Sequence, residues 1–320
     1  MAVYTQISDG ELEAFLGEYD LGELVSFSGI AEGVENSNFL VRTTADTFIL
    51  TLYEKRVNRD DLPFFIELMR HLAKKGLNVP SPVPGRDGAT LRELNGRPAA
   101  IVTFVDGVWR RRIRPSCCRE LGAGMAEMHV AGLDYDRVRE NNLSVAGWRP
   151  LFDSCDLPKR EIYHAMHNQL NMELHHLEAH WPRDLPVGTI HADLFPDNVF
   201  FLGDTLSGFI DFYFACTDIL AYDLAICLNA WCFETDGSFN VTKARNLVMG
   251  YESVRPLSAA ERAALPILAR GSAIRFLLTR LYDWLNHPEG ALVKPKDPME
   301  YHQKLRFHQG VSGPAAYGLT

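Results

Sequence analysis

The feature that most constrains this chain is a succession of strand patterns and polar loop residues between 187 and 212. Residues 187–190 read as a buried strand, and a loop carrying Asp193 and Asn198 follows directly. Two further short strand patterns come next, and the second of them ends at Asp211. Functional side chains concentrate in loops that follow rigid elements. We therefore expect short strands that hold these three oxygen-bearing side chains near their ends.

The spacing of these side chains is typical of phosphoryl transfer from ATP. Asn198 follows Asp193 by five residues, and Asp211 follows Asn198 by thirteen. In such sites the first carboxylate orients the attacking hydroxyl and accepts its proton, while an amide oxygen and a second carboxylate bind magnesium. Magnesium keeps several waters, so two protein ligands suffice. We predict Asp193 as the catalytic residue and Asn198 and Asp211 as metal ligands, although each alone would also fit a turn or a strand cap.

The composition is that of a globular protein without a basic surface. Of the 320 residues, 47% are hydrophobic and 23% are charged, and the net charge is −9. Nucleic acid and anionic membranes bind basic faces, so we expect neither as a partner. No apolar run reaches the roughly 18 residues of a membrane span, the start shows no secretory-signal pattern, and the six cysteines form no CxxC pair. We expect a cytoplasmic protein, monomeric or homodimeric, with reduced thiols.

The first part of the chain, 1–106, predicts a small antiparallel β lobe with one inserted helix. Ser8 and Glu11 form a capping-box pattern that opens a short preceding helix. The dipeptide Asn95-Gly96 is a strong hairpin signal. Strands are expected at 24–30, 38–43, 47–53, 90–94 and 99–104, and the inserted helix at 61–75.

The remainder, 107–320, predicts a larger and mainly helical lobe. We expect the last residues, 310–320, to fray. Helices are expected at 115–132, 158–181, 221–233, 242–251 and 259–284. Together the two parts predict an α+β fold with two lobes.

The loop motif resembles that of the aminoglycoside phosphotransferase and choline kinase superfamily, which is related to the protein kinases. The string His191-Ala-Asp-Leu-Phe-Pro-Asp-Asn198, with Ile210-Asp-Phe212, carries the resemblance, which extends over nearly the whole chain. It implies a two-lobed protein-kinase-like fold that uses ATP and Mg²⁺. We expect His191 to bond the backbone across its loop, and the resemblance gives Asp223 a structural role on the helix after the metal-binding Asp.

Four further stretches are similar to the bacterial homoserine kinases built on this fold. They are 33–39, 48–54, 104–107 and 274–283. The similarity implies ATP-dependent phosphorylation of the side-chain hydroxyl of L-homoserine, on the way to threonine. No single residue can be derived as specific for homoserine, so choline, an aminoglycoside or a hydroxylated amino acid stays open as the substrate. A non-catalytic nucleotide-binding relative is the third alternative.

The residues expected to bind the nucleotide are less sharply marked. Gly29 and Gly33 lie in a loop between two strand patterns, where backbone N–H groups can approach phosphates. This is not a full Gly-x-Gly-x-x-Gly pattern, and a plain hairpin fits it equally well. We expect the backbone of Phe104 and Val105, at the hinge between the lobes, to bond the adenine.

The phosphate-binding cation of the family is missing from its usual strand. The resemblance aligns that position with Thr51. Lys55, four residues later, or Arg42 on the neighbouring strand is predicted to replace it, with Glu67 as the acidic partner on the following helix. Thr51 also motivates the non-catalytic alternative.

An amino-acid acceptor carries a carboxylate and an ammonium group, so its site needs a cation and an acid. Arg275, Arg280 and Asp283 all lie in the helix expected at 259–284. We predict that they bind the substrate, with Arg275 on the carboxylate and Asp283 or Asp218 near the ammonium. Salt bridges inside the larger lobe are the alternative interpretation of these residues.

Overall fold

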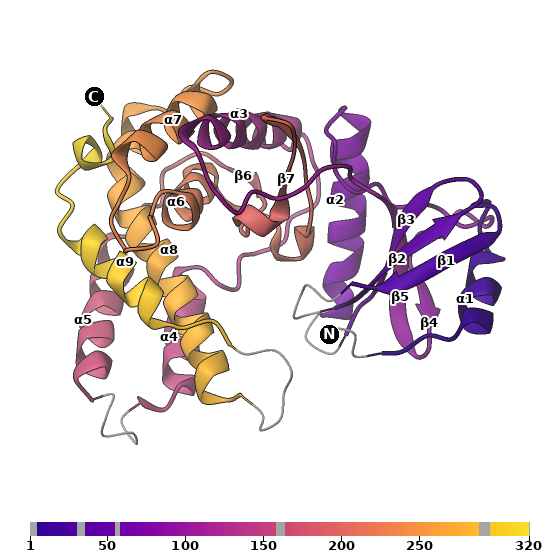
Figure 1. The fold of residues 1–320 in the computed structure, drawn as a ribbon. Helices are drawn as coiled ribbons and strands as arrows, with labels where there is room; N and C mark the ends of the chain where they lie inside the picture. Colours follow the sequence, from indigo (N-terminus) through magenta and orange to yellow (C-terminus); the bar gives the residue numbers. More distant parts are fainter. Residues whose placement is uncertain (1–4, 31–35, 55–57, 158–163, 288–294, 320) are drawn as a thin grey trace. The chain divides into compact units, whose positions relative to one another are not determined.

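The computed structural model describes residues 5–30, 36–54, 58–157, 164–287 and 295–319. The described residues divide into two compact units. The first contains the residues up to 107 together with 207–213, and the second contains the other described residues. Figure 1 shows a β-rich first unit and a mainly helical second unit, as the predicted α+β class requires. The nucleotide and acceptor roles of the lobes 1–106 and 107–320 stay predictions.

The first unit is built on a five-stranded antiparallel sheet in the order β1-β2-β3-β5-β4. The predicted hairpin joins β4 and β5, and its residues Asn95 and Gly96 have φ angles of 50° and 72°. Asparagine and glycine adopt this left-handed conformation most readily. The strands are β1 (Leu24–Gly29), β2 (Ser37–Thr43), β3 (Thr47–Leu52), β4 (Arg92–Leu94) and β5 (Arg97–Thr103).

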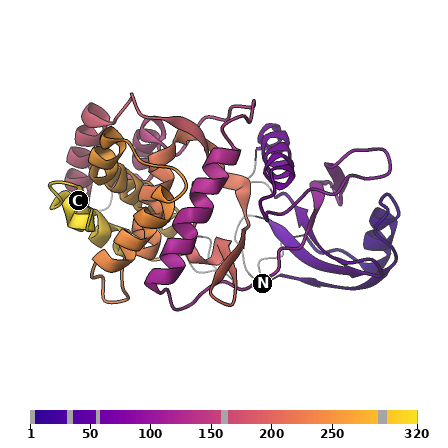
Figure 2. The ribbon, with the colours of Figure 1, turned by 90° about the horizontal axis from the view of Figure 1, so that it is seen from above.

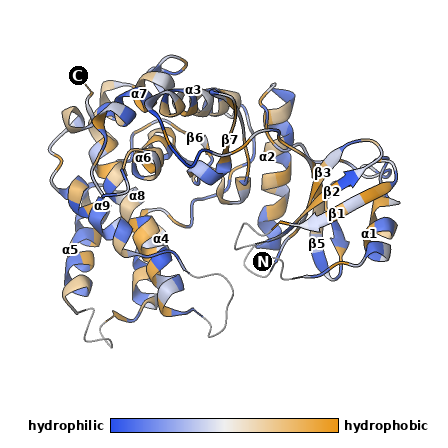
Figure 3. Ribbon diagram, in the orientation of Figure 1, coloured by the Kyte–Doolittle hydropathy of each residue, from blue (hydrophilic) through white to orange (hydrophobic). Residues whose placement is uncertain are grey.

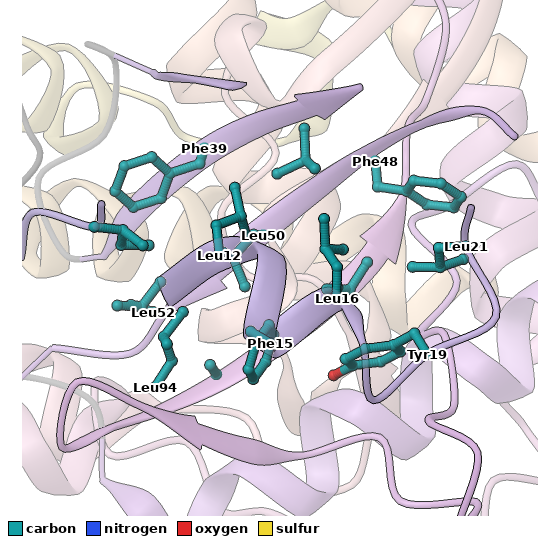
Figure 4. Close-up of a cluster of buried hydrophobic side chains, with 14 residues drawn as sticks. Leu12, Phe15, Leu16, Tyr19, Leu21, Phe39, Phe48, Leu50, Leu52 and Leu94 are labelled. Atoms are coloured by element: carbon teal, nitrogen blue, oxygen red, sulfur yellow. The ribbon is translucent and has the colours of Figure 1, made fainter. Parts of the chain in front are cut away.

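One face of this sheet is covered by the helix α1 (Asp9–Leu16), which opens with the predicted capping box between Ser8 and Glu11. Figure 4 shows the apolar side chains of α1 among those of the strands. Val41 and Leu50 belong to this core. Because side chains alternate along a strand, the neighbouring polar residues of β2 and β3 lie on the opposite face of the sheet.

The helix α2 (Leu62–Lys74) confirms the predicted inserted helix. Its buried residues recur at helical spacing, among them Phe65, Leu68 and Leu72. Figure 3 shows hydrophobic and hydrophilic colours alternating along α2, as expected for a helix with one buried side.

The second unit consists mainly of helices. Among the described residues, none of the helices has the length and apolar content of a membrane span. Two of the helices, α4 and α9, were not predicted, and the predicted helix start at 158–163 lies outside the described residues. The helices are α3 (Pro115–Ala131), α4 (Val145–Ser154), α5 (His164–His180), α6 (Leu220–Trp231), α7 (Val241–Glu252), α8 (Ala259–Leu285) and α9 (Met299–Gln309).

Two short pairs of strands frame the polar loop. The strand β6 (Val187–Ile190) pairs antiparallel with β9 (Cys216–Ile219). The strand β9 was not predicted from the sequence. The strands β7 (Val199–Leu202) and β8 (Thr205–Phe209) form a separate two-stranded sheet. The loop after β6 is therefore held by strands at both of its ends.

Helices α3 and α7 pack with their backbones in direct contact, and Figures 1 and 2 show them side by side. A Cβ atom on Gly122 of α3 would lie 2.0 Å from the carbonyl oxygen of Leu247. A Cβ atom on Gly250 of α7 would lie 2.0 Å from the carbonyl oxygen of Arg119. Glycine is required at both positions because any side chain would force the two helices apart.

The prediction that the chain frays from residue 310 onward is wrong for the described residues 310–319. Residues Pro314–Tyr317 form a 3₁₀ turn, and Tyr317 is fully buried. The Tyr317 hydroxyl lies 2.8 Å from Nδ1 of His308, and Nε2 of His308 lies 3.1 Å from Oδ1 of Asn229. These contacts with α9 and α6 hold the chain end, and they join residues too far apart in sequence for a local pattern to show.

Candidate active site

The loop after β6 brings Asp193 and Asn198 together, as their spacing predicts. The side-chain amide of Asn198 donates to the Asp193 backbone oxygen at 2.8 Å and to its carboxylate Oδ2 at 3.1 Å. Asn198 is buried at the end of the 3₁₀ turn Pro196–Asn198, whereas Asp193 is half-buried. The amide nitrogen of Asn198 is thus used to fix Asp193, which leaves its amide oxygen as the group suited to a hard cation.

A buried carboxylate holds the backbone just before Asp193. Asp223 of α6 accepts the N–H groups of His191 and Ala192, each at 2.9 Å, and lies 3.1 Å from Nε2 of His129. Burial alone would raise the pKa of the Asp223 carboxyl, but the hydrogen bonds and charges of His129 and His191 hold it below its ordinary value. Asp223 is therefore ionised at neutral pH and anchors the loop.

His129 connects this anchor to helices far from the loop. Because an ionised carboxylate only accepts hydrogen bonds, Nε2 of His129 carries the hydrogen shared with Asp223. Its Nδ1 lies 2.9 Å from the Tyr251 hydroxyl, which also accepts a hydrogen bond from Arg255 at 3.1 Å. Arg255 in turn pairs with Glu261 at the start of α8 at 2.8 Å. Helices α3, α6, α7 and α8 thus all contribute to fixing the loop.

The rest of the loop is held through its backbone oxygens. Ala192 has a φ of 62°, an uncommon value for alanine. Its carbonyl accepts a hydrogen bond from Nη1 of Arg275 at 2.7 Å, and the Leu194 carbonyl accepts one from Nε1 of Trp231 at 2.7 Å. Arg275 is only 1% exposed. Arg275 was predicted to bind the substrate, and the contact that the structure shows for it is this hydrogen bond to the backbone of Ala192.

Asp211 belongs to the first unit and follows β8. It is exposed and has a φ of 64°, a left-handed conformation that is uncommon for aspartate and is often found at functional sites. The hydroxyls of Tyr53 and Tyr213 lie 3.2 Å apart. Burial raises the pKa of Tyr213 to about 12, and the charge of Asp211 acts in the same direction.

A neutral polar group occupies the position of the missing cation. Oγ1 of Thr51 donates to Oδ1 of Asn38 at 2.8 Å. Arg42, one of the two predicted replacements, pairs with Thr47 and lies four residues along β2 from Asn38, a separation of roughly 13 Å. Lys55, the other, lies outside the described residues.

The remaining predicted nucleotide residues lie at strand ends and on α2. Gly29 ends β1 opposite Phe39, and Gly33 lies outside the described residues. Phe104 is exposed and Val105 is buried directly after β5. Glu67 forms an ion pair with Arg70 one turn later on α2. These nucleotide assignments stay predictions.

Two of the predicted substrate residues lie near the end of α8. Nη1 of Arg280 is 2.6 Å from the Glu300 carboxylate and also bonds the Asp297 backbone oxygen at 3.3 Å. Asp283 is half-buried. The structure therefore places Arg280 against the start of α9, a helix that the sequence reasoning missed.

The donor set of the loop suits a small hard cation. Among the described residues, no three His, Cys, Asp or Glu side chains cluster as a metal site. Magnesium does not need such a cluster, because it takes one or two protein oxygens and fills its other positions with water and phosphate. Asn198 supplies an oxygen of this kind, and the roles of Asn198 and Asp211 as metal ligands stay predictions.

Comparison with known proteins decides the family. A model described as the phosphotransferase enzyme family matches residues 26–257, a span that includes the loop of Asp193, Asp211 and Asp223. The chain belongs to the phosphotransferase enzyme family. The enzyme class predicted from the loop motif is confirmed.

Named relatives resemble this phosphotransferase over its full length. A homoserine kinase of Xanthobacter autotrophicus is 66% identical over 320 residues, and one of Paramagnetospirillum magneticum is 64% identical over 325 residues. Each alignment covers 100% of both chains. The resemblance to bacterial homoserine kinases that the sequence predicted is confirmed.

Solved structures of low sequence identity share the fold of this phosphotransferase. Choline kinase from Cryptosporidium parvum Iowa II has a TM-score of 0.69 at 13% identity, with 94% of each chain covered. Amicoumacin kinase hAmiN, in complex with AMP-PNP and Ca²⁺, has a TM-score of 0.67 at 15% identity, with 95% of this chain and 92% of that chain covered. The predicted protein-kinase-like fold is confirmed.

Proposed function

We propose that this phosphotransferase transfers the γ-phosphoryl group of ATP to the side-chain hydroxyl of L-homoserine. The observation that carries the choice of acceptor is the end-to-end identity of 59–66% with relatives named homoserine kinase. Phosphoryl transfer itself is supported by the arrangement of Asp193 and Asn198, which matches the roles that such a reaction requires. The product is O-phospho-L-homoserine. The cytoplasmic location and the monomeric or homodimeric state stay predictions.

The chemistry requires a positioned carboxylate at the acceptor. The hydroxyl oxygen bonds to the γ-phosphorus as the bond from that phosphorus to the bridging oxygen breaks, and ADP leaves with the electron pair. Asp193 orients the hydroxyl and receives its proton. The amide of Asn198 holds the Asp193 carboxylate at 3.1 Å, so the base is fixed before the acceptor binds.

The nucleotide is expected to bind with a divalent cation, as in the amicoumacin kinase complex with AMP-PNP and Ca²⁺. We propose Mg²⁺ as this cation, held by Oδ1 of Asn198 and the Asp211 carboxylate. The ion would neutralise charge on the phosphates. Replacement of Asp211 by Asn is expected to raise the magnesium concentration needed for half-maximal turnover.

Other acceptors remain alternatives to homoserine. Solved relatives act on choline and on antibiotics, but at 12–13% identity they support the fold alone. A non-catalytic nucleotide-binding role is disfavoured because the loop around Asp193 is held by a buried carboxylate and a buried arginine.

The test is a coupled ADP-release assay with Mg-ATP and L-homoserine, choline, kanamycin, hydroxylysine or L-serine. Turnover on L-homoserine alone is the expected result, and preferred turnover on another alcohol would discard the acceptor. Asp193→Asn should lower kcat by orders of magnitude and leave ATP binding nearly intact. Asp197→Asn is the matched control, because Asp197 is an exposed residue of the same loop. Equal activity of the two variants would refute the role of Asp193.

A further inference from the structure

Tyr301, on the first turn of α9, has a polar group without a protein partner. Its side chain is fully buried, and within the described part of the chain its hydroxyl makes no hydrogen bond. Of the other buried tyrosines, Tyr251 and Tyr317 have partners for their hydroxyls, whereas Tyr19 and Tyr222 share the lack of a partner within the described part of the chain. A buried hydroxyl that lacks a partner destabilises a protein. What distinguishes Tyr301 is its surroundings, an aromatic residue of the loop of Asp193 and two cations.

The ring of Tyr301 lies beside the catalytic loop. Its centroid is 6.5 Å from that of Phe195, two residues after Asp193, and 5.3 Å from that of Phe276 on α8. Phe195 and Phe276 also contact each other at 4.9 Å. Burial raises the pKa of the Tyr301 hydroxyl, the charge of Arg280 opposes that shift, and the negative charges of Glu300 and Asp193 add to it. Tyr301 is thus placed next to the loop of Asp193 through the ring of Phe195.

Two cations flank the same ring. The guanidinium of Arg280 and the ammonium of Lys304 each lie 4.4 Å from the ring centroid of Tyr301. Both bond the carboxylate of Glu300, each at 2.6 Å. The carboxylate of Glu300 therefore balances only one of the two positive charges, and Glu300, Arg280 and Lys304 together carry a net positive charge. Lys296, over the Phe195 ring at 5.4 Å, adds a further cation on this side.

The arrangement is already spaced to hold a carboxylate. Glu300 places one carboxylate oxygen on Arg280 and the other on Lys304. Its side chain is 51% exposed, whereas those of Arg280 and Lys304 are 10% and 8% exposed. The two cations are therefore fixed, and the carboxylate between them is the member that solvent or a second carboxylate can replace.

We propose that Tyr301, Arg280 and Lys304 form the subsite for the α-carboxylate of the amino-acid acceptor, next to Asp193. The proposal rests on the function proposed above and deepens it. The Tyr301 hydroxyl donates to the carboxylate, and the two cations balance its charge. Arg280 was predicted to bind the substrate, and the residues that complete the subsite with it, Tyr301 and Lys304, lie on α9.

The proposed subsite predicts that the enzyme discriminates against simple alcohols. L-homoserine and 3-aminopropan-1-ol share a hydroxyl, a three-carbon chain and an ammonium group, and differ by the carboxylate. A site built to bond a polar group discriminates strongly against the analogue that lacks it, because the buried groups of the site then stay unpaired. Alcohols without a carboxylate are accordingly expected to be poor substrates.

The kinetic test compares the full-length chain with its Tyr301→Phe variant, using Mg-ATP and either acceptor. For L-homoserine, KM should rise about tenfold or more, the effect of losing one hydrogen bond to a charged group. The KM for ATP should not change. The catalytic efficiency toward the aminopropanol, or its inhibition constant where turnover is too slow, should also stay the same. An unchanged KM for L-homoserine, or an equal change with both acceptors, overturns the proposal.

Thermal unfolding separates ligand binding from a structural role. Tyr301→Phe should melt at the same or a higher temperature than the unaltered chain, because it removes a buried hydroxyl without a partner. Tyr317→Phe is the matched control: it removes a bonded hydroxyl, so it should lower the melting temperature without altering the KM for L-homoserine. A comparable loss of stability in Tyr301→Phe overturns the proposal. If the unaltered chain does not phosphorylate L-homoserine, the proposed function itself fails.

Discussion

Replacement of Asp223 by Asn is the sharpest perturbation of the loop that carries Asp193. The carboxylate accepts three hydrogen bonds, from the backbone N–H groups of His191 and Ala192 and from Nε2 of His129. Asparagine has nearly the same shape but replaces one oxygen by an NH₂ group. That group cannot accept a hydrogen bond, so at least one backbone N–H of the loop is left facing another donor.

The expected cost follows from the geometry. One buried N–H without an acceptor costs roughly 1–3 kcal/mol. The remaining bonds lose their charge assistance, which is about half of their strength, or about 1–2 kcal/mol in total. Asp223→Asn should therefore lower the free energy of unfolding by roughly 2–5 kcal/mol, a large share of the ~5–15 kcal/mol typical of a native protein. Since the same N–H groups fix the residue before Asp193, kcat should fall as well.

The assay is urea denaturation together with ADP release under saturating substrates. Asp204→Asn is the control, because Asp204 is 66% exposed and its ion pair with Arg114 is worth at most about 1 kcal/mol. The expected pattern is a large loss of stability and of kcat in Asp223→Asn and little change in Asp204→Asn. An unfolding free energy within about 0.5 kcal/mol of the unaltered chain would contradict the reasoning.

Two further predictions concern packing and pH. Burial lowers the pKa of His308 to about 3, below its usual 6.5, so as pH falls below 6.5 only the unfolded chain binds the proton. The free energy of unfolding should drop by about 2 kcal/mol between pH 7 and pH 5, and His308→Gln should remove that part of the pH dependence. If denaturation at several pH values shows the same pH dependence for His308→Gln and for the unaltered chain, the prediction is excluded. Gly122→Ala should destabilise by about 1–3 kcal/mol or more, because its Cβ would meet the Leu247 carbonyl oxygen at 2.0 Å. Gly10→Ala on the open side of α1, where no atom lies within 4 Å, should instead stabilise by about 0.5–1 kcal/mol; both shifts can be read from thermal melts.

Local patterns predicted much of the fold. The capping box at Ser8, the hairpin at Asn95-Gly96 and the period of α2 each involve residues within a few positions of one another. Such preferences act between residues that are close together in the sequence, so they can be recognised without the tertiary structure. The same holds for Asp193 and Asn198, whose five-residue spacing spans a single loop and brings their side chains into hydrogen-bond contact.

Other features depended on contacts between distant residues. The strand β9 is four residues long and exists through its pairing with β6, and the chain end that was expected to fray is fixed by Tyr317 against His308. Arg275 donates a hydrogen bond to the carbonyl of Ala192, 83 residues earlier, and its predicted role in substrate binding stays a prediction. No period or spacing encodes such a contact.

The sequence by itself determined the family, the oxygen-bearing residues of the loop after β6 and most of the regular elements, because each of these is carried by side chains close together along the chain. Only the tertiary structure decided what holds the loop and what lies beside it. Asp223 and His129 come from separate helices, and Tyr301 comes from a helix with no distinctive pattern. Their roles follow from burial and from the presence or absence of a hydrogen-bond partner, which are properties of the folded chain.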